Sequence, residues 1–318
     1  MYFDPRPKWR KADLYDRERE LKQLVEGLKH PLTLVLGLRR SGKTSLVLVG
    51  LSEFEAPYVL VDCRSLPLNP SRRDLLLALQ RGFEQAAKQF ASAWNSLKEY
   101  LKRVEGIEVA GVKLSLSWKT TSVEDVLSAL NEWAEDHSTR AIVAFDEFQS
   151  IRGEPGILRF LAHAYDYQRG LSFVLTGSEM GLLYDALRVE DPSSPMYGRA
   201  FVEVRLSRFS KQQSLEFLQL GFDQVGISPS EEALELAVER FVGIVVWLTY
   251  FGFQAWKRGI ASEELVEEVF EMAVKQSFQE LEHFLQSRGA ASRRYRVMLK
   301  AVAEGAARWS DCLLYTSD

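Results

Sequence analysis

Short apolar runs alternate with segments of helical periodicity over the first two-thirds of the chain. Runs in which nearly every position is apolar are typical of buried strands, whereas apolar residues spaced three and four apart are typical of amphipathic helices. The strands expected from these runs are residues 32–36, 58–62, 141–145, 171–175 and 201–204. Because helical segments separate them, we expect an α/β fold with a parallel sheet.

Helices are expected between these strands, together with one segment whose hydrophobic pattern alternates as in a strand. Helices are expected from about residue 16, over 71–104 with breaks, and over 122–136. Ser71 provides an N-cap for the second of these. Between residues 107 and 118 alternate positions are apolar, which predicts a β-hairpin.

From about Lys211 onward the pattern is helical only. The last long helix has apolar positions from Val266 to Leu285 and a glutamate-rich opposite face, which indicates a face exposed to solvent. Residues 241–256 carry no charge, but they fall short of the ~20 residues that cross a bilayer. We therefore expect a buried helix there and no membrane partner.

Composition narrows the function classes. The chain has 318 residues, 46% of them hydrophobic, and a net charge of -4, so no global basic field indicates nucleic acid. Cys63 and Cys312 match no metal-site spacing, and residues 1–6 lack the apolar core of a signal peptide. We expect a reduced, cytoplasmic protein.

A glycine-bounded loop between the first strand and a helix carries the clearest chemistry. It matches the phosphate-binding pattern G-x-x-x-x-G-K-[ST], in which successive backbone N–H groups and the helix N-terminus face one anion. Lys43 is expected to reach the β- and γ-phosphates, and the Thr44 hydroxyl to take one Mg²⁺ position. The nucleotide-binding residues expected here are Gly37, Leu38, Arg39, Arg40, Ser41, Gly42, Lys43, Thr44 and Ser45.

Two adjacent carboxylates follow the strand at 141–145. Asp146 is placed to hold Mg²⁺ through its water shell, and Glu147 to polarise a water for attack on the γ-phosphate. The alternative is that the two acids only cap the N-terminus of a helix.

Further catalytic candidates follow the strand at 171–175 and precede the strand at 201–204. Thr176 and Ser178 directly follow the strand at 171–175. Either could sense the γ-phosphate or place the water, and the alternative is that they only cap a helix. Arg199 follows a flexible glycine and could reach the transferring phosphate in cis or from a neighbouring subunit of a homo-oligomer. The alternative for Arg199 is a structural or surface arginine.

Together these motifs resemble the archaeal-type ATPase family, which belongs to the STAND group of P-loop NTPases and is related to AAA+ proteins. The resemblance rests on residues 16–21, 37–44, 141–147, 175–178 and 197–199. It implies a three-layer αβα sandwich with sheet order 5-1-4-3-2, a helical lid and a C-terminal winged helix. The domains expected from it are a P-loop core over 1–208, a lid over 209–287 and the start of a winged helix over 288–318.

The resemblance also implies contacts with the nucleotide. It places Arg17 and Glu18 near the adenine, and it favours ATP and ADP with Mg²⁺ as the bound ligands. The family's lid carries a Gly-x-Pro near the nucleotide, whereas this chain has Gly243-Ile244-Val245, without the proline. The basic residues between 293 and 300 make DNA a candidate partner of a longer parent protein.

Three functions fit these residues. The first is a slow, Mg²⁺-dependent ATPase in which the nucleotide state sets the lid position, and the second is a regulatory nucleotide-binding module with little turnover. The third is a phosphotransferase acting on a small metabolite, which Glu147 argues against because kinases activate an acceptor hydroxyl rather than water.

Overall fold

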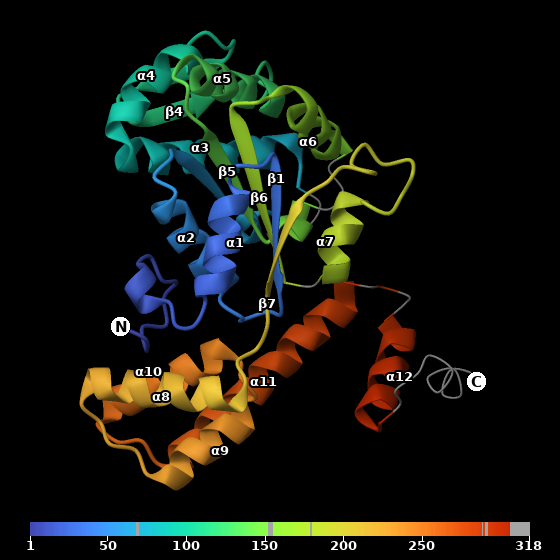
Figure 1. The fold of residues 1–318 in the computed structure, drawn as a ribbon. Coiled ribbons are helices and arrows are strands. Elements are labelled where there is room, and N and C mark those ends of the chain that lie inside the picture. The colour runs from blue at the N-terminus through green and yellow to red at the C-terminus, as the bar shows by residue number, and fades with distance from the viewer. Residues whose placement is uncertain (68–69, 152–154, 179, 288, 290–291, 306–318) are drawn as a thin grey trace.

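A five-stranded parallel sheet forms the centre of the computed structural model, which describes residues 1–67, 70–151, 155–178, 180–287, 289 and 292–305 (Figure 1). The strands lie in the order β2-β5-β6-β1-β7. Numbered among themselves along the chain and read from the β7 edge, these five follow the order 5-1-4-3-2, as the family resemblance implies. Their bounds are β1 Leu32–Gly37, β2 Tyr58–Asp62, β5 Ala141–Asp146, β6 Leu171–Gly177 and β7 Val202–Leu206.

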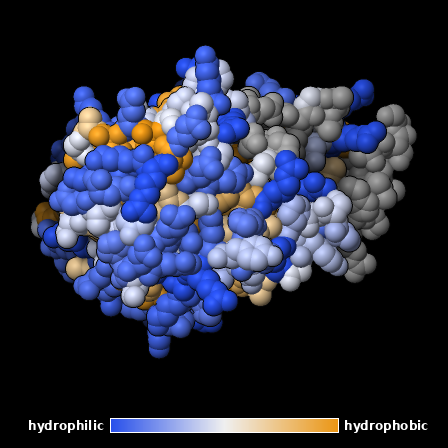
Figure 2. Space-filling model, turned by 90° about the horizontal axis from the view of Figure 1, so that it is seen from above, coloured by the Kyte–Doolittle hydropathy of each residue, from blue (hydrophilic) through white to orange (hydrophobic). Residues whose placement is uncertain are grey.

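The expected hairpin is also present. It pairs β3 (Ile107–Ala110) with β4 (Lys113–Leu116) in a separate antiparallel sheet. Figure 2 looks down on this end of the molecule and shows a mostly hydrophilic surface with a patch of apolar side chains to one side. The cavity described below lies among other segments of the chain.

Helices cover both faces of the sheet, and alternate residues of β1 show how. Leu34 and Leu36 pack into the cluster that includes α3 and α5, whereas Val35 packs into the cluster that includes α1 and α2. Capping boxes at Ser71 and Ser122 begin α3 and α5, and the sequence predicts the cap at Ser71. The helices of this part are α1 Glu18–Gly27, α2 Lys43–Glu53, α3 Arg72–Gln89, α4 Ala91–Leu101, α5 Val123–Asp136, α6 Pro155–Tyr167 and α7 Met180–Leu187.

A second, all-helical part follows β7 and lies beyond its carboxyl end (Figure 1). Its apolar cluster joins residues of α8, α9, α10 and α11, and most of the charge-free segment forms α10, one face of which is buried. None of the helices in the described part of the chain is long and apolar enough to cross a membrane. The helices are α8 Lys211–Val225, α9 Glu231–Phe241, α10 Val245–Arg258, α11 Glu263–Ser287 and α12 Ser292–Ala303.

The N-terminal residues pack where the sequence did not place them. Phe3, which the predicted boundary assigns to the core domain, is fully buried in the helical cluster against Phe217 and Phe222. Only the first part of the segment expected to begin a winged helix, including α12, is described, and residues 306–318 lie outside the described residues.

Candidate nucleotide-binding and catalytic site

A cavity of about 1160 Å³ lies where the carboxyl edge of the sheet meets the helical part. Because all five strands are parallel, the segments that follow β1, β5 and β6 reach this edge together. The cavity walls come from the loop after β1, the N-terminal segment, α10 and α11. Its volume is sufficient for a nucleotide.

The loop after β1 has the backbone that its glycines predict. Gly42 has φ 93°, a conformation that favours glycine, and Arg40 has φ 66°. A Cβ at Gly37 would lie 2.8 Å from the Leu206 carbonyl oxygen, so Gly37 is needed because β7 passes close by. Ser41 is buried, and its hydroxyl has no hydrogen-bond partner within the described chain, whereas Leu38 is 53% exposed.

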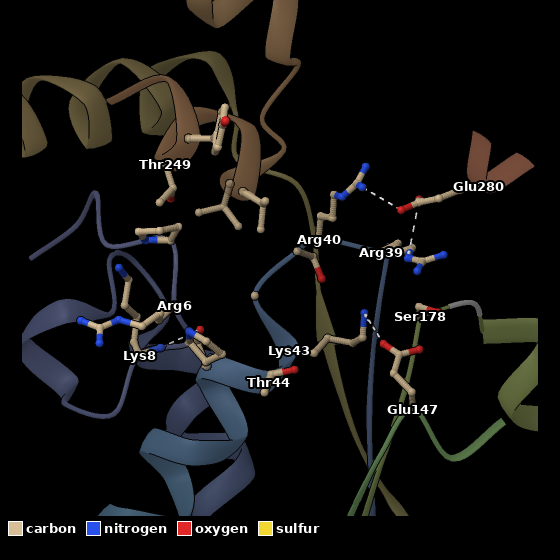
Figure 3. A pocket seen from close by; sticks show the side chains of 18 of the residues that line it. Arg6, Lys8, Arg39, Arg40, Lys43, Thr44, Glu147, Ser178, Thr249 and Glu280 are labelled. Atoms are coloured by element: carbon tan, nitrogen blue, oxygen red, sulfur yellow. Dashed lines mark hydrogen bonds and ion pairs between the residues drawn. The ribbon is translucent and has the colours of Figure 1, made fainter. Parts of the chain in front are cut away.

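Lys43 begins α2 with its side chain buried under the loop. Its ammonium donates hydrogen bonds to the carbonyl oxygens of Gly37 and Leu38, at 3.1 and 3.0 Å. The Glu147 carboxylate lies 3.8 Å away (Figure 3). Burial lowers the pKa of Lys43, and the carboxylates of Glu147 and Asp146 oppose that shift.

Two threonines bracket the buried Asp146 carboxylate. Thr44 Oγ1 donates to Asp146 Oδ2 at 3.0 Å, and Thr176 Oγ1 donates to Asp146 Oδ1 at 2.7 Å. Thr176 also accepts a hydrogen bond from the Glu147 backbone N–H at 2.9 Å. The expectation that Thr176 faces the γ-phosphate is therefore wrong. Its hydroxyl donates to Asp146 and accepts from the Glu147 backbone, and Thr176 does not line the cavity.

Arg64 is a site residue that the sequence reasoning missed. Its guanidinium forms a two-point contact with Asp62, at 2.8 and 3.0 Å, and lies 3.4 Å from Asp146 Oδ2. It lines the cavity from the end of β2. An arginine shortly after a strand carries no recognisable spacing, so no sequence signal singled it out.

Glu147 turns out of β5 with a left-handed backbone, φ 58°. Its carboxylate accepts a hydrogen bond from the Gln149 amide, which also donates to Ser178 Oγ at 3.1 Å. Ser178 and Glu147 both line the cavity next to Lys43 (Figure 3). The sequence placed Ser178 here as an alternative to Thr176, but it did not single out Gln149.

Two arginines of the loop join it to α11. Arg40 Nη2 lies 2.7 Å from Glu280 Oε1, and Arg39 Nε lies 3.6 Å from the other Glu280 oxygen (Figure 3). The Arg40 guanidinium also stacks over the Trp247 ring at 4.3 Å, and burial lowers its pKa. Both arginines line the cavity, and both pair with Glu280 of the helical part.

The far end of the cavity is formed by a segment that the sequence analysis did not assign. Asp4 to Lys8 line it together with Tyr15 and Thr249 (Figure 3). The Lys8 backbone N–H donates to Ser45 Oγ at 3.0 Å, which ties this segment to the first turn of α2. Pro5 and Pro7 are the signal that could have indicated an extended, exposed segment.

Arg17 and Glu18 separate in the structure. Arg17 is buried and lines the cavity, with Nη2 donating to the Ser207 carbonyl at 2.7 Å and its guanidinium 4.7 Å from the Phe209 ring centroid. Glu18 is the first residue of α1 and is not among the residues that line the cavity. The geometry brings Arg17 to the site but not Glu18.

Arg199 does not reach the cavity of its own chain. It lies just before the amino end of β7, whose residues Val202 to Leu206 run about 13 Å toward the cavity edge at ~3.3 Å per residue. Its guanidinium pairs with Asp166, with Nη2 2.6 Å from Oδ2, and bonds the Pro195 carbonyl. The alternative that Arg199 reaches the phosphate of its own chain is therefore wrong, and the alternative that it acts on a neighbouring subunit stays a prediction.

Comparisons with known proteins agree with this geometry. A family model described as an ATPase domain predominantly from Archaea matches residues 14–251. A Walker-type ATPase of Pyrococcus abyssi is 36% identical, with a TM-score of 0.81 over 100% of this chain and 87% of that one. A search of curated proteins found no match.

More distant structures share the fold. The Aeropyrum pernix ORC2 protein, solved with ADPNP and ADP, is 15% identical with a TM-score of 0.56, over 85% of this chain and 70% of that one. The Aeropyrum pernix ORC1 protein in complex with DNA is 15% identical with a TM-score of 0.52, over 95% and 77%. With a nucleotide-sized cavity at its phosphate loop and a family model over most of its length, the chain belongs to the ATPase-domain family found predominantly in Archaea.

Proposed function

We propose that this ATPase hydrolyses ATP with Mg²⁺ and that the bound nucleotide sets the position of the helical part. The observation that carries the proposal is the convergence of Lys43, Thr44 and Glu147 at the cavity, with the buried Asp146 hydrogen-bonded to Thr44. These four side chains supply a phosphate-binding cation, two oxygen ligands and a general base.

The residues present fit Mg²⁺. Thr44 and Asp146 offer a hydroxyl and a carboxylate whose oxygens are 3.0 Å apart, and Mg²⁺ prefers oxygen ligands. The described residues contain no group of three or more His, Cys, Asp or Glu that could hold a metal. That agrees with an ion bound by few protein ligands together with water and phosphate, and when bound it would neutralise charge on the phosphates.

The chain's own residues account for the remaining steps. The Lys43 ammonium and the backbone N–H groups of the loop bind and orient the phosphates. Glu147 accepts the proton of the attacking water, whose oxygen bonds to the γ-phosphorus while the bond to the β–γ bridging oxygen breaks and ADP leaves. Thr176 keeps Glu147 at the cavity by accepting its backbone N–H.

Contacts across the cavity link the nucleotide to the helical part. Glu280 of α11 engages both Arg39 and Arg40, and Val245 of α10 lies over the loop, 3.7 Å from where a Cβ at Gly42 would be. A nucleotide bound in the cavity would contact both sides and would compete with Glu280 for the arginines. Such differential contacts are what allow a ligand to shift a conformational equilibrium.

Two of the basic residues between 293 and 300 that made DNA a candidate partner are paired with acids. Arg296 of α12 forms a two-point ion pair with Glu282, with both oxygens at 2.6 Å, and Lys300 lies 3.8 Å from Glu304. DNA binding by α12 and assembly into a homo-oligomer stay predictions.

Phosphate release by purified wild-type protein and the Glu147→Gln variant tests the proposal. We expect the variant to bind ATP as wild type does and to release phosphate at least about 100-fold more slowly, because it lacks the general base. Glu26→Gln, at a carboxylate on the exposed side of α1, is the matched control and should behave as wild type. Equally slow release by wild type and Glu147→Gln would favour the regulatory module.

A further inference from the structure

The Gln149 side chain connects the Glu147 carboxylate to the end of β6. It belongs to the short helical turn Phe148–Ile151 directly after Glu147, and it lines the cavity. Its Nε2 group donates to Glu147 Oε2 and to Ser178 Oγ, the latter at 3.1 Å. Both acceptors line the same cavity.

The orientation of this amide follows from its neighbours. If the oxygen and nitrogen were exchanged, the amide oxygen would face a carboxylate oxygen, and two acceptors repel. With the nitrogen toward Glu147, Oε1 of Gln149 is buried and has no hydrogen-bond partner in the described part of the chain.

Space for the amide comes from Gly177 at the end of β6. A Cβ at Gly177 would lie 3.3 Å from Gln149 Oε1 and 2.8 Å from the Leu183 Cβ. A side chain at position 177 would therefore meet Leu183 and the Gln149 amide, and the glycine leaves room for both.

The other partner of the Glu147 carboxylate is one that ATP would remove. Lys43 lies 3.8 Å from Glu147 and is 4% exposed, beside the loop carbonyls that it caps. When phosphates bind, the ammonium turns to them. The amide of Gln149 then stays on the carboxylate as its hydrogen-bond donor.

We propose that Gln149 is a positioning residue that holds the Glu147 carboxylate toward the attacking water once ATP has engaged Lys43. The inference rests on the proposed function, in which Glu147 is the general base. One amide donor from the turn, together with the Thr176 hydroxyl on the backbone N–H, fixes the side chain and the main chain of Glu147 from two sides. Gln149 acts through Glu147 and does not itself take part in proton transfer.

The test compares steady-state phosphate release, ATP affinity by calorimetry and melting temperature for a small set of variants. Gln149→Met keeps the length of the side chain but removes the donor; we expect kcat to fall about 10-fold to 100-fold, as for a misplaced catalytic group, with ATP affinity within about twofold of wild type. Ser178→Ala leaves the contact with Glu147 and should lower kcat less. The matched control is Gln89→Met, which removes an amide bonded to the Tyr58 hydroxyl at 2.8 Å, away from the cavity, and should leave kcat unchanged.

A double variant separates positioning from mere packing. Because Gln149 acts through Glu147, adding Gln149→Met to Glu147→Gln should slow release no further than Glu147→Gln alone. If the methionine variant does not fold, Gln149→Leu removes the same donor and serves the same comparison. Gln149→Asn keeps a donor and should recover part of kcat.

Each outcome bears on one statement. A wild-type kcat in Gln149→Met, beside a strongly impaired Glu147→Gln, overturns the role of Gln149 and leaves the proposed function standing. An ATP affinity that falls in proportion to kcat also overturns it, because Gln149 would then bind nucleotide. Wild-type turnover in Glu147→Gln overturns the proposed function itself.

Discussion

Gly243 joins α9 to α10 at a point where an added methyl group has no room. It has φ 76°, and a Cβ there would lie 1.9 Å from the Phe209 carbonyl oxygen. The Phe209 backbone N–H also donates to the Gly243 carbonyl at 3.0 Å. In Gly243→Ala the two backbones must separate by about 1 Å, which loses this bond at a cost of about 1–3 kcal/mol, in addition to about 1–2 kcal/mol for the left-handed conformation of alanine.

Gly226 provides the control because it has the same backbone conformation without the close approach. It ends α8 at φ 70°, with nothing within 4 Å of an added Cβ. Gly226→Ala should therefore cost only the conformational part, about 1–2 kcal/mol, against about 2–5 kcal/mol for Gly243→Ala. At 2–4 °C per kcal/mol, the melting temperature should fall by roughly 4 °C and 10 °C respectively in differential scanning fluorimetry.

The same substitution should weaken ATP binding. Val245, two residues beyond Gly243, lies against the loop at Gly42 and lines the cavity, so a displaced α10 opens the site. Gly226 is outside the cavity, and Gly226→Ala should bind ATP as wild type does. Equal melting temperatures for the two variants would refute the reasoning from close approach.

Three further predictions follow from the site. Phe3→Ala should lower stability by about 3–5 kcal/mol, measured by thermal unfolding, and should weaken ATP binding in calorimetry because the buried ring anchors the N-terminal segment that lines the cavity; unchanged affinity would contradict that link. Glu280→Gln should increase proteolytic cleavage around α11 in the absence of nucleotide by a few-fold, since two ion pairs to the loop are lost, and an unchanged cleavage rate would contradict it. Burial lowers the pKa of Lys43 below the ordinary lysine value of 10.5, and only the protonated form attracts phosphate. ATP affinity should therefore begin to fall at a pH below 10.5 as the pH is raised. Affinity titrated at increasing pH checks this, and a decline that begins only near 10.5 would count against it.

Much of the fold was predictable because it is encoded locally. The apolar run 141–145 and the serine cap at 71 are short-range patterns, and the structure places a strand and a helix start where they indicate. The phosphate loop was predictable for the same reason, since a left-handed Gly42 and a lysine at the helix start lie within one short motif.

The rest of the site depends on contacts that no local pattern records. Arg40 meets Glu280 across 240 positions of the chain, and Phe3 reaches a helical cluster that begins some two hundred residues later. The sequence could not choose between Thr176 and Ser178, because only the pairing of β6 beside β5 brings the Thr176 hydroxyl to Asp146. The sequence left open whether Arg199 acts in cis, because the length of β7 separates Arg199 from the cavity edge only once the direction of that strand in the sheet is known.

Isothermal titration calorimetry of the wild-type chain and of Lys43→Ala with Mg-ATP tests most directly whether the loop after β1 binds the phosphates. The structure predicts binding by wild type and a loss of at least about 100-fold in affinity for the variant, since removing a charged partner from buried phosphate contacts costs about 3 kcal/mol or more. Equal affinities for the two proteins, with both shown to be folded, would contradict the assignment of this cavity as the ATP site.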